Sequence, residues 1–176
     1  MNELRDDLPE NIKRFFKKIQ NYLDTKLYFY GSVTRADYVP GKSDIDVAIF
    51  TDNEHSTISK LQHVLHVKRD AFEKIVWKLN GTMIYGYKIK CEKYTHINSE
   101  ISIYNNDFKT VILDELTKPL QNQSWLVFIL LYLLKLFYYK IPLLSKDSYM
   151  RYKRKILNEI IAKKESVFFV MKPNNH

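Results

Sequence analysis

The sequence is poor in the residues that build cross-linked or repetitive proteins. Its single cysteine, Cys91, excludes an intramolecular disulfide and a thiolate metal cluster. It has 4 glycines and 5 prolines against 45% hydrophobic residues, which excludes wholesale disorder. No charged and then apolar leader opens the sequence, so we expect an intracellular, cytoplasmic protein in a reducing compartment.

The one long hydrophobic run, residues 125–144, is interrupted by charge. Lys135 lies at its middle, and Lys140 and Pro142 lie near its end. A bilayer span needs about 20 apolar residues and rarely tolerates a central lysine. We therefore expect no membrane contact, and interpret this run as the central helix of a small helical bundle.

Length and charge narrow the class of protein. A chain of 176 residues forms one compact domain or two small lobes. The formal net charge of +8 favours anionic partners such as nucleotides or nucleic acid. A general compositional bias toward lysine, asparagine, isoleucine and tyrosine is the alternative explanation.

Hydrophobic spacing predicts an α+β fold, with a small mixed sheet and flanking helices followed by a C-terminal helical lobe. The expected elements are a helix at 9–24, strands at 26–30 and 45–50, helical segments within 54–79 that break at 68–70, strands at 82–94 and 96–104, helices ending near 118, spanning 124–140 and starting at 147, and a short strand at 167–170 with no assigned place. A change in composition near Asn105 predicts an α/β half at 1–105 and an all-helical half at 106–176.

Two aspartates point to a metal site. Asp44 and Asp46 are two apart on a β-prone run, so both carboxylates project from one face while Ile45 and Val47 point to the core. Adjacent carboxylates repel each other unless a cation neutralises them, and Mg²⁺ prefers carboxylate and phosphate oxygens. The pattern predicts a divalent-metal site.

A glycine and a serine before these aspartates indicate a phosphate site. Gly31 and Ser32 follow a predicted strand and begin a helical turn, so backbone N–H groups and a hydroxyl face one point. Glycine leaves room for phosphates to approach the backbone closely.

Together, Tyr30–Ser32 and Asp44–Val47, separated by the spacer 33–43, resemble the signature of the DNA polymerase beta nucleotidyltransferase superfamily. Arg35 and Ser43 also match residues that many members have in this stretch. The resemblance implies a polymerase beta-like palm, a nucleoside triphosphate substrate (ATP or UTP) and two Mg²⁺ or Mn²⁺ ions.

The superfamily needs a third carboxylate on a neighbouring strand, and the segment 99–103 resembles its position. Glu100 faces away from Ile101 and Ile103 by strand alternation, so it is the expected partner of the two aspartates. Glu92 and Asp107 remain the alternatives.

The helical half is similar to terminal uridylyltransferases and cytoplasmic poly(A) polymerases. These enzymes have a leucine-rich helix with a lysine and then a Ser-Tyr pair, matched here by Leu133–Phe137 and Ser148–Met150. The resemblance implies a catalytic domain at 1–105 and a helical lobe at 106–176 that binds nucleotide and acceptor. Within this lobe it implies that Lys135 and Ser148 contact the triphosphate and that Tyr149 stacks on the base.

Other interpretations of two of these residues stay open. In the alternative interpretation, Lys135 extends to the surface or pairs with an acid such as Asp114 or Glu115. The alternative for Tyr149, one of 13 tyrosines, is an ordinary position in the hydrophobic core.

A group of cations beside aromatic residues predicts a path for single-stranded RNA. The cations of this group are Lys146, Arg151, Lys153, Arg154 and Lys155. Arg35 is a further residue that we expect to contact the acceptor. An ordinary solvated helix face is the alternative.

These features predict a Mg²⁺-dependent nucleotidyltransferase that adds a nucleoside monophosphate to an RNA 3′ end without a template and releases pyrophosphate. The alternatives are nucleotide transfer to a protein or small molecule, and a non-catalytic nucleotide- or RNA-binding subunit. The short chain also suggests a protein partner that completes the acceptor channel.

Overall fold

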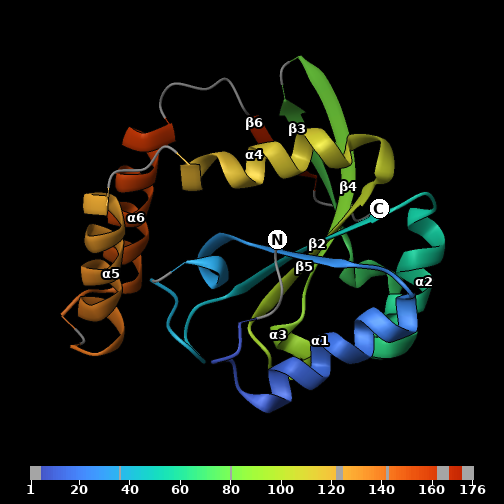
Figure 1. The fold of residues 1–176 in the computed structure, drawn as a ribbon, viewed down its shortest axis with the longest axis horizontal. Helices are drawn as coiled ribbons and strands as arrows, with labels where there is room; N and C mark the ends of the chain where they lie inside the picture. Colours follow the sequence, from blue (N-terminus) through green and yellow to red (C-terminus); the bar gives the residue numbers. More distant parts are fainter. Residues whose placement is uncertain are drawn as a thin grey trace.

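The computed structural model of the protein describes residues 5–35, 37–79, 81–121, 125–141, 143–161 and 167–171 (Figure 1). Its elements in chain order are α1 (Glu10–Leu23), β1 (Leu27–Tyr30), the 3₁₀ helix η1 (Gly31–Thr34), β2 (Ile45–Thr51), α2 (Glu54–Leu65), η2 (Arg69–Ala71), β3 (Glu73–Leu79), β4 (Thr82–Lys90), α3 (Glu92–Thr95), β5 (Ser99–Asn105), η3 (Asn106–Phe108), α4 (Lys109–Gln121), α5 (Trp125–Tyr139), α6 (Lys146–Ile161) and β6 (Val167–Met171).

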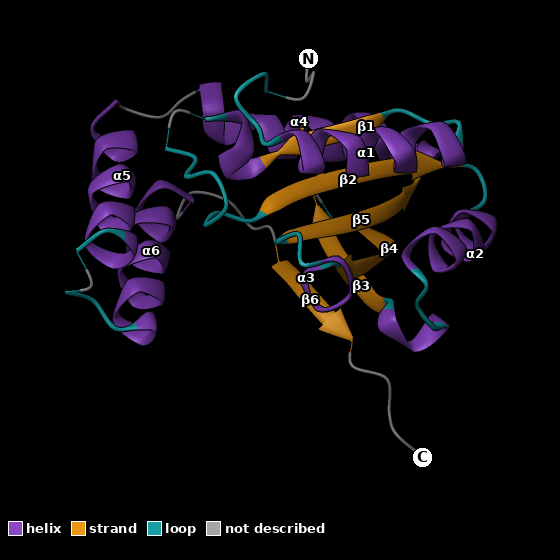
Figure 2. Ribbon diagram, turned by 90° about the horizontal axis from the view of Figure 1, so that it is seen from below, coloured by secondary structure: helices purple, strands orange, loops and turns teal. Residues whose placement is uncertain are grey.

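The strands form one six-stranded sheet in the order β1-β2-β5-β4-β3-β6 (Figure 2). β2 and β5 run parallel, and the other neighbouring pairs are antiparallel. The expected mixed sheet with flanking helices is confirmed.

Helices cover both faces of the sheet. One face packs against α1 and α2, in a core that includes Phe16, Leu61, Val47 and Ile101. The opposite face packs against α4, where Ile112 meets Phe50. The two cores exist because successive residues of β2 and β5 point to opposite faces.

The first helix shows how local sequence determines this packing. Ile12, Phe16, Ile19 and Leu23 recur at helical spacing and are all buried. Asp24 ends the helix in the left-handed conformation, and its N–H donates to the carbonyl of Gln20. Charged residues occupy the solvent face.

Of the two helical segments predicted within 54–79, the first is confirmed as α2 and the second is wrong. α2 ends at Leu65, His66 adopts the left-handed conformation, and Glu73–Leu79 form strand β3. β3 pairs with β4 along its whole length, which outweighs local helix propensity. Ile75 and Leu79, four residues apart, fit one face of a helix and also one face of a strand.

The C-terminal half contains three long helices and returns to the sheet at β6. α5 and α6 pack on each other to one side of the sheet (Figures 1 and 2). β6 pairs with β3, which confirms the short strand expected near 167–170 and gives it a place. The division into domains at residue 105 stays a prediction. Among the described residues, no helix combines the length and apolar character needed to cross a bilayer.

Candidate active site

Three acidic residues lie at the start of two neighbouring strands, β2 and β5. In the β1–β2 pair Asp46 lies opposite Tyr30, the last residue of β1, and in the parallel pair it lies opposite Glu100. Asp44 immediately precedes β2. Residues in direct register share a face of the sheet, so Asp46 and Glu100 are neighbours on the face that α4 covers.

The carboxyl group of Asp46 shows that these charges interact. Burial, and then the negative charges of Asp44 and Glu100, raise its pKa to about 7. The positive charges of Lys153 and Arg35 act in the opposite direction. The arrangement therefore concentrates negative charge that a cation would neutralise.

Gly31 is required here by the close approach of Asp46. It has a φ of +71°, and a Cβ at this position would overlap the Oδ2 atom of Asp46. We expected phosphates to approach the backbone here, whereas in the structure the Asp46 carboxylate occupies this space. A contact between this turn and phosphate stays a prediction.

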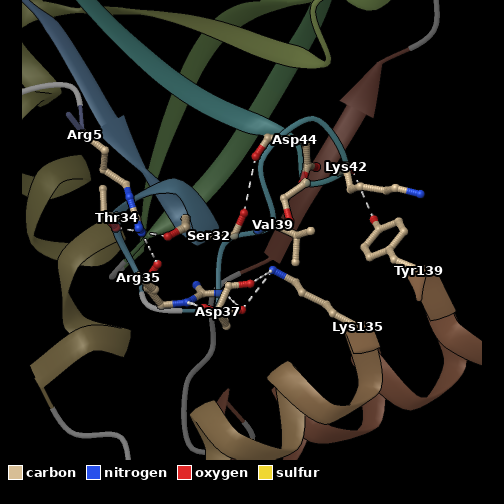
Figure 3. Close-up of polar contacts among 12 residues, drawn as sticks. Arg5, Ser32, Thr34, Arg35, Asp37, Val39, Lys42, Asp44, Lys135 and Tyr139 are labelled. Atoms are coloured by element: carbon tan, nitrogen blue, oxygen red, sulfur yellow. Dashed lines mark hydrogen bonds and ion pairs between the residues drawn. The ribbon is translucent and has the colours of Figure 1, made fainter. Parts of the chain in front are cut away.

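Hydrogen bonds fix the loop that joins Ser32 to the aspartates. The hydroxyl of Ser32 donates to the carbonyl of Asp44 over 3.3 Å, as Figure 3 shows. Farther along, the N–H of Val39 donates to the hydroxyl of Ser43 over 3.2 Å. The loop therefore holds Asp44 beside the turn that follows β1.

Lys135 pairs with an acid that sequence reasoning did not consider. Its ammonium lies 3.0 Å from Oδ2 of Asp37 and donates to the Asp37 carbonyl over 2.8 Å (Figure 3). The structure thus gives it neither Asp114 nor Glu115 as partner. Burial lowers the pKa of Lys135, and the carboxylate of Asp37 opposes this effect. A triphosphate contact for this lysine is untested.

Arg35 contacts the same aspartate. Its guanidinium donates to both carboxylate oxygens of Asp37 over 2.7 and 3.1 Å, and its carbonyl accepts from Arg5. Burial raises the pKa of Asp37, but the bonds and charges of Arg35 and Lys135 outweigh it, so the pKa is lowered. The predicted acceptor contact of Arg35 would have to coexist with this pair. Sequence reasoning missed Asp37 because its partner Lys135 lies 98 residues away in the chain.

The predicted Ser-Tyr pair lies at the start of α6. The hydroxyl of Ser145 accepts from the N–H of Ser148 and donates to its hydroxyl, which caps the helix. Tyr149 is buried and stacks on Tyr138, with ring centroids 4.4 Å apart. One face of the ring is therefore already covered, as the core interpretation expected. Base stacking by Tyr149 stays untested.

The predicted acceptor cations on α6 differ in exposure. Lys146, Arg151, Arg154 and Lys155 are exposed to solvent. Lys153 is half-buried and lies near enough to Asp46 to affect its pKa. The structure thus distinguishes one half-buried cation, whose charge affects Asp46, from four exposed ones.

Glu100 has a cationic neighbour that sequence reasoning missed. Its Oε2 atom lies 3.2 Å from the ammonium of Lys88 on β4. Strand alternation places Lys88 on the same sheet face, a signal that becomes usable only once the strand order is known. The alternative acids, Glu92 and Asp107, are exposed on α3 and η3, and neither is among the causes of the Asp46 shift.

The donor chemistry of the site fits hard divalent cations. Asp44, Asp46 and Glu100 offer carboxylate oxygens, the ligands that Mg²⁺ and Mn²⁺ prefer. Burial raises the pKa of Asp46, and the negative charges of Asp44 and Glu100 add to this effect, which a bound cation would oppose. Within the described part of the chain, no three acidic, histidine or cysteine side chains already converge as a metal cage, and Glu100 is paired with Lys88.

Comparison with known proteins gives one match. Residues 9–116, more than half of the chain, match the family model described as "Nucleotidyltransferase domain". A search of curated proteins and a search of solved structures each found no significant match. The matched segment runs from the beginning of α1 into α4 and so includes the three carboxylates.

Proposed function

The chain belongs to the nucleotidyltransferase domain family, and from this premise we propose that it transfers a nucleoside monophosphate from a nucleoside triphosphate to a hydroxyl group. The observation that supports this reaction most strongly is the direct register of Asp46 with Glu100, beside Asp44 and the Gly31 turn. The polymerase beta-like fold places these residues at one edge of the sheet.

In this proposal Asp44, Asp46 and Glu100 hold two Mg²⁺ ions. When bound, such ions supply charge neutralisation on the phosphates and activate the attacking hydroxyl. Asp46 must be ionised to bind, and a cation favours the ionised form. The protein supplies position and charge, so the reaction needs neither a histidine nor a cysteine.

The remaining substrate contacts follow from what lies near the acids. The backbone N–H groups after Tyr30 and the hydroxyl of Ser32 are available to the phosphates, provided Ser32 gives up its bond to the Asp44 carbonyl. Lys153 faces the acidic site and is our candidate for neutralising the leaving pyrophosphate. Lys135 is a weaker candidate because Asp37 holds its ammonium.

We place an RNA 3′ end first among the acceptors. The exposed cations of α6 support this choice, since they form a basic surface on the same helix as Lys153. Cations beside aromatic rings suit a single strand, and Arg151 lies 5.7 Å from the ring centroid of Tyr152.

A small molecule or a protein side chain is the second candidate acceptor. A pocket of about 650 Å³ supports it, with a lining that includes Tyr38, Lys42, Ser43 and Tyr139. None of the three acids lines this pocket, but its lining residues Ser43 and Ile45 flank Asp44 in the chain, and its volume falls within the usual range for small-ligand sites.

One incubation separates these acceptors. The purified protein is mixed with Mg²⁺, each α-labelled NTP in turn, and an acceptor pool of RNA oligonucleotide, protein and small hydroxyl compounds. We expect label on RNA that is lost in Asp46→Asn and kept in the matched surface variant Asp107→Asn. Label on protein or small molecule alone would support the second acceptor. No label with any NTP, together with Mg²⁺-independent nucleotide binding, would instead identify a non-catalytic subunit.

A further inference from the structure

The only cation that the described residues place in ion-pair contact with the three carboxylates is Lys88. Its ammonium lies 3.2 Å from Glu100 Oε2 and 4.0 Å from Glu73 Oε2. Lys88 is 8% exposed, whereas the side chain of Glu73 is 47% exposed. One buried ammonium therefore lies between an acid of the candidate site and an acid at the surface.

Strand register explains this geometry. Lys88 is opposite Glu73 on one side and Ser102 on the other, and it reaches Glu100 diagonally along β5. Glu100 is itself opposite Asp46. All of these side chains share one sheet face, so Lys88 can turn between Glu100 and Glu73 by side-chain rotation without movement of the backbone.

An ammonium on Glu100 has a direct consequence for cation binding. It competes with a divalent ion for the same carboxylate oxygen, and its charge repels the ion. It also stabilises the free protein, because the charges of Asp44, Asp46 and Glu100 otherwise repel each other. Glu73 offers the displaced ammonium a second carboxylate.

We infer that Lys88 is the internal counter-ion of the metal site: it neutralises Glu100 in the free protein and moves to Glu73 when Glu100 binds a divalent cation. The inference rests on the proposed function, because it takes Glu100 as a metal ligand. It makes Lys88 a positioning residue that sets cation affinity. A cross-strand ion pair that only stabilises the sheet would not change this affinity.

The test measures Mn²⁺ binding to the free protein by electron paramagnetic resonance of the unbound ion, without nucleotide or turnover. Lys88→Met should bind Mn²⁺ about tenfold more tightly, because the competing charge is gone. Lys88→Arg should stay within about twofold of wild type, because it keeps the charge. Lys90→Met is the matched control: it removes an exposed lysine from the same strand, opposite Glu100, and should change the affinity less than twofold.

Glu73→Gln provides an independent test at an accessible site. Without its second carboxylate, Lys88 should remain on Glu100 and weaken Mn²⁺ binding by about threefold. This variant carries the test if Lys88→Met does not fold. Unchanged affinity in both variants, or equal tightening in Lys88→Met and Lys90→Met, would overturn the inference.

Asp46→Asn distinguishes this inference from the proposed function. If wild type binds Mn²⁺ and Asp46→Asn does not, the metal site stands and the Lys88 and Glu73 variants decide the inference alone. If neither wild type nor Lys88→Met binds Mn²⁺, the metal site itself fails and both proposals fall. Binding by Lys88→Met alone would support the counter-ion role.

Discussion

Lys135 and Asp37 form a buried ion pair across 98 residues of sequence. The ammonium on α5 lies 3.0 Å from the carboxylate in the loop before β2, and the two residues are 4% and 1% exposed. The pair therefore connects the helical half of the chain to the loop that positions Asp44. We expect this ion pair to stabilise the loop and to fix its orientation.

Breaking this pair should destabilise the protein. Lys135→Met leaves Asp37 with Arg35 as its cation, and Asp37→Asn leaves a buried ammonium without its carboxylate, so each should lower the free energy of unfolding by about 3 kcal/mol. Because both substitutions remove the same interaction, the double variant should lose much less unfolding free energy than the sum of the two single losses. Urea unfolding of the four proteins measures this coupling. Additive losses would mean that the pair is not an energetic unit.

Nucleotide kinetics distinguish this positioning role from a triphosphate contact. If Lys135 positions the loop through Asp37, both single variants should lower kcat by a similar factor. If Lys135 binds the triphosphate, Lys135→Met should raise the KM for NTP much more than Asp37→Asn does. The ratio of the two KM changes is the deciding measurement.

Gly31 and Gly41 offer a matched pair of substitutions. Both have a φ of +71°, but a Cβ meets Asp46 at Gly31 and nothing within 4 Å at Gly41. Gly41→Ala should therefore cost about 1 kcal/mol from backbone conformation alone. Gly31→Ala should cost more and should also abolish transfer, because Asp46 must move. Equal stability losses and retained activity at Gly31 would contradict the contact.

The raised pKa of Asp46 predicts an unusual dependence of stability on pH. The folded pKa is about 7, above the ordinary value of 3.8, so the folded protein retains a proton that the unfolded chain releases between these values. Stability should therefore fall as pH rises from about 4 to 7. Asp46→Asn removes this loss, so in EDTA it should be about 2 to 4 kcal/mol more stable than wild type at pH 8. At pH 4 the gain should nearly disappear. Thermal unfolding of both proteins at pH 4 and pH 8 measures this difference. An equal gain in stability at the two pH values would contradict the raised pKa.

The exposed cations of α6 predict salt-sensitive RNA binding. Replacing Arg151, Arg154 and Lys155 with glutamine should weaken binding to a single-stranded oligonucleotide and reduce the slope of log K against log salt by about 2. The control replaces three exposed cations of α1, namely Arg14, Lys17 and Lys18, and removes the same charge. Equal effects of the two triple variants would indicate nonspecific attraction.

The local sequence was sufficient to predict the direction of side chains where a motif lies on a strand of alternating residues. The alternation around Asp44 and Asp46 predicted which side chains face the core, and alternation also favoured Glu100 over Glu92 and Asp107. The structure gives Glu100 the register opposite Asp46. Its catalytic role stays a prediction.

Contacts between distant segments could not be predicted in this way. The identity of β3 depends on pairing with β4 and β6, and the same apolar spacing also fits a helix. The partner of Lys135 lies 98 residues away in the chain, and Lys88 reaches Glu100 only because β4 pairs with β5. Local propensity and periodicity contain no information on such distances.

The proposed function assigns nucleotide transfer to the acids at the start of β2 and β5. Its most direct test is the Mg²⁺-dependent release of pyrophosphate from labelled NTP in the presence of the acceptor pool, compared among wild type, Asp46→Asn, Glu100→Gln and Glu92→Gln. We predict release by wild type and Glu92→Gln, and a loss of at least about 100-fold in the other two variants. Undiminished release by Asp46→Asn and Glu100→Gln would contradict the claim.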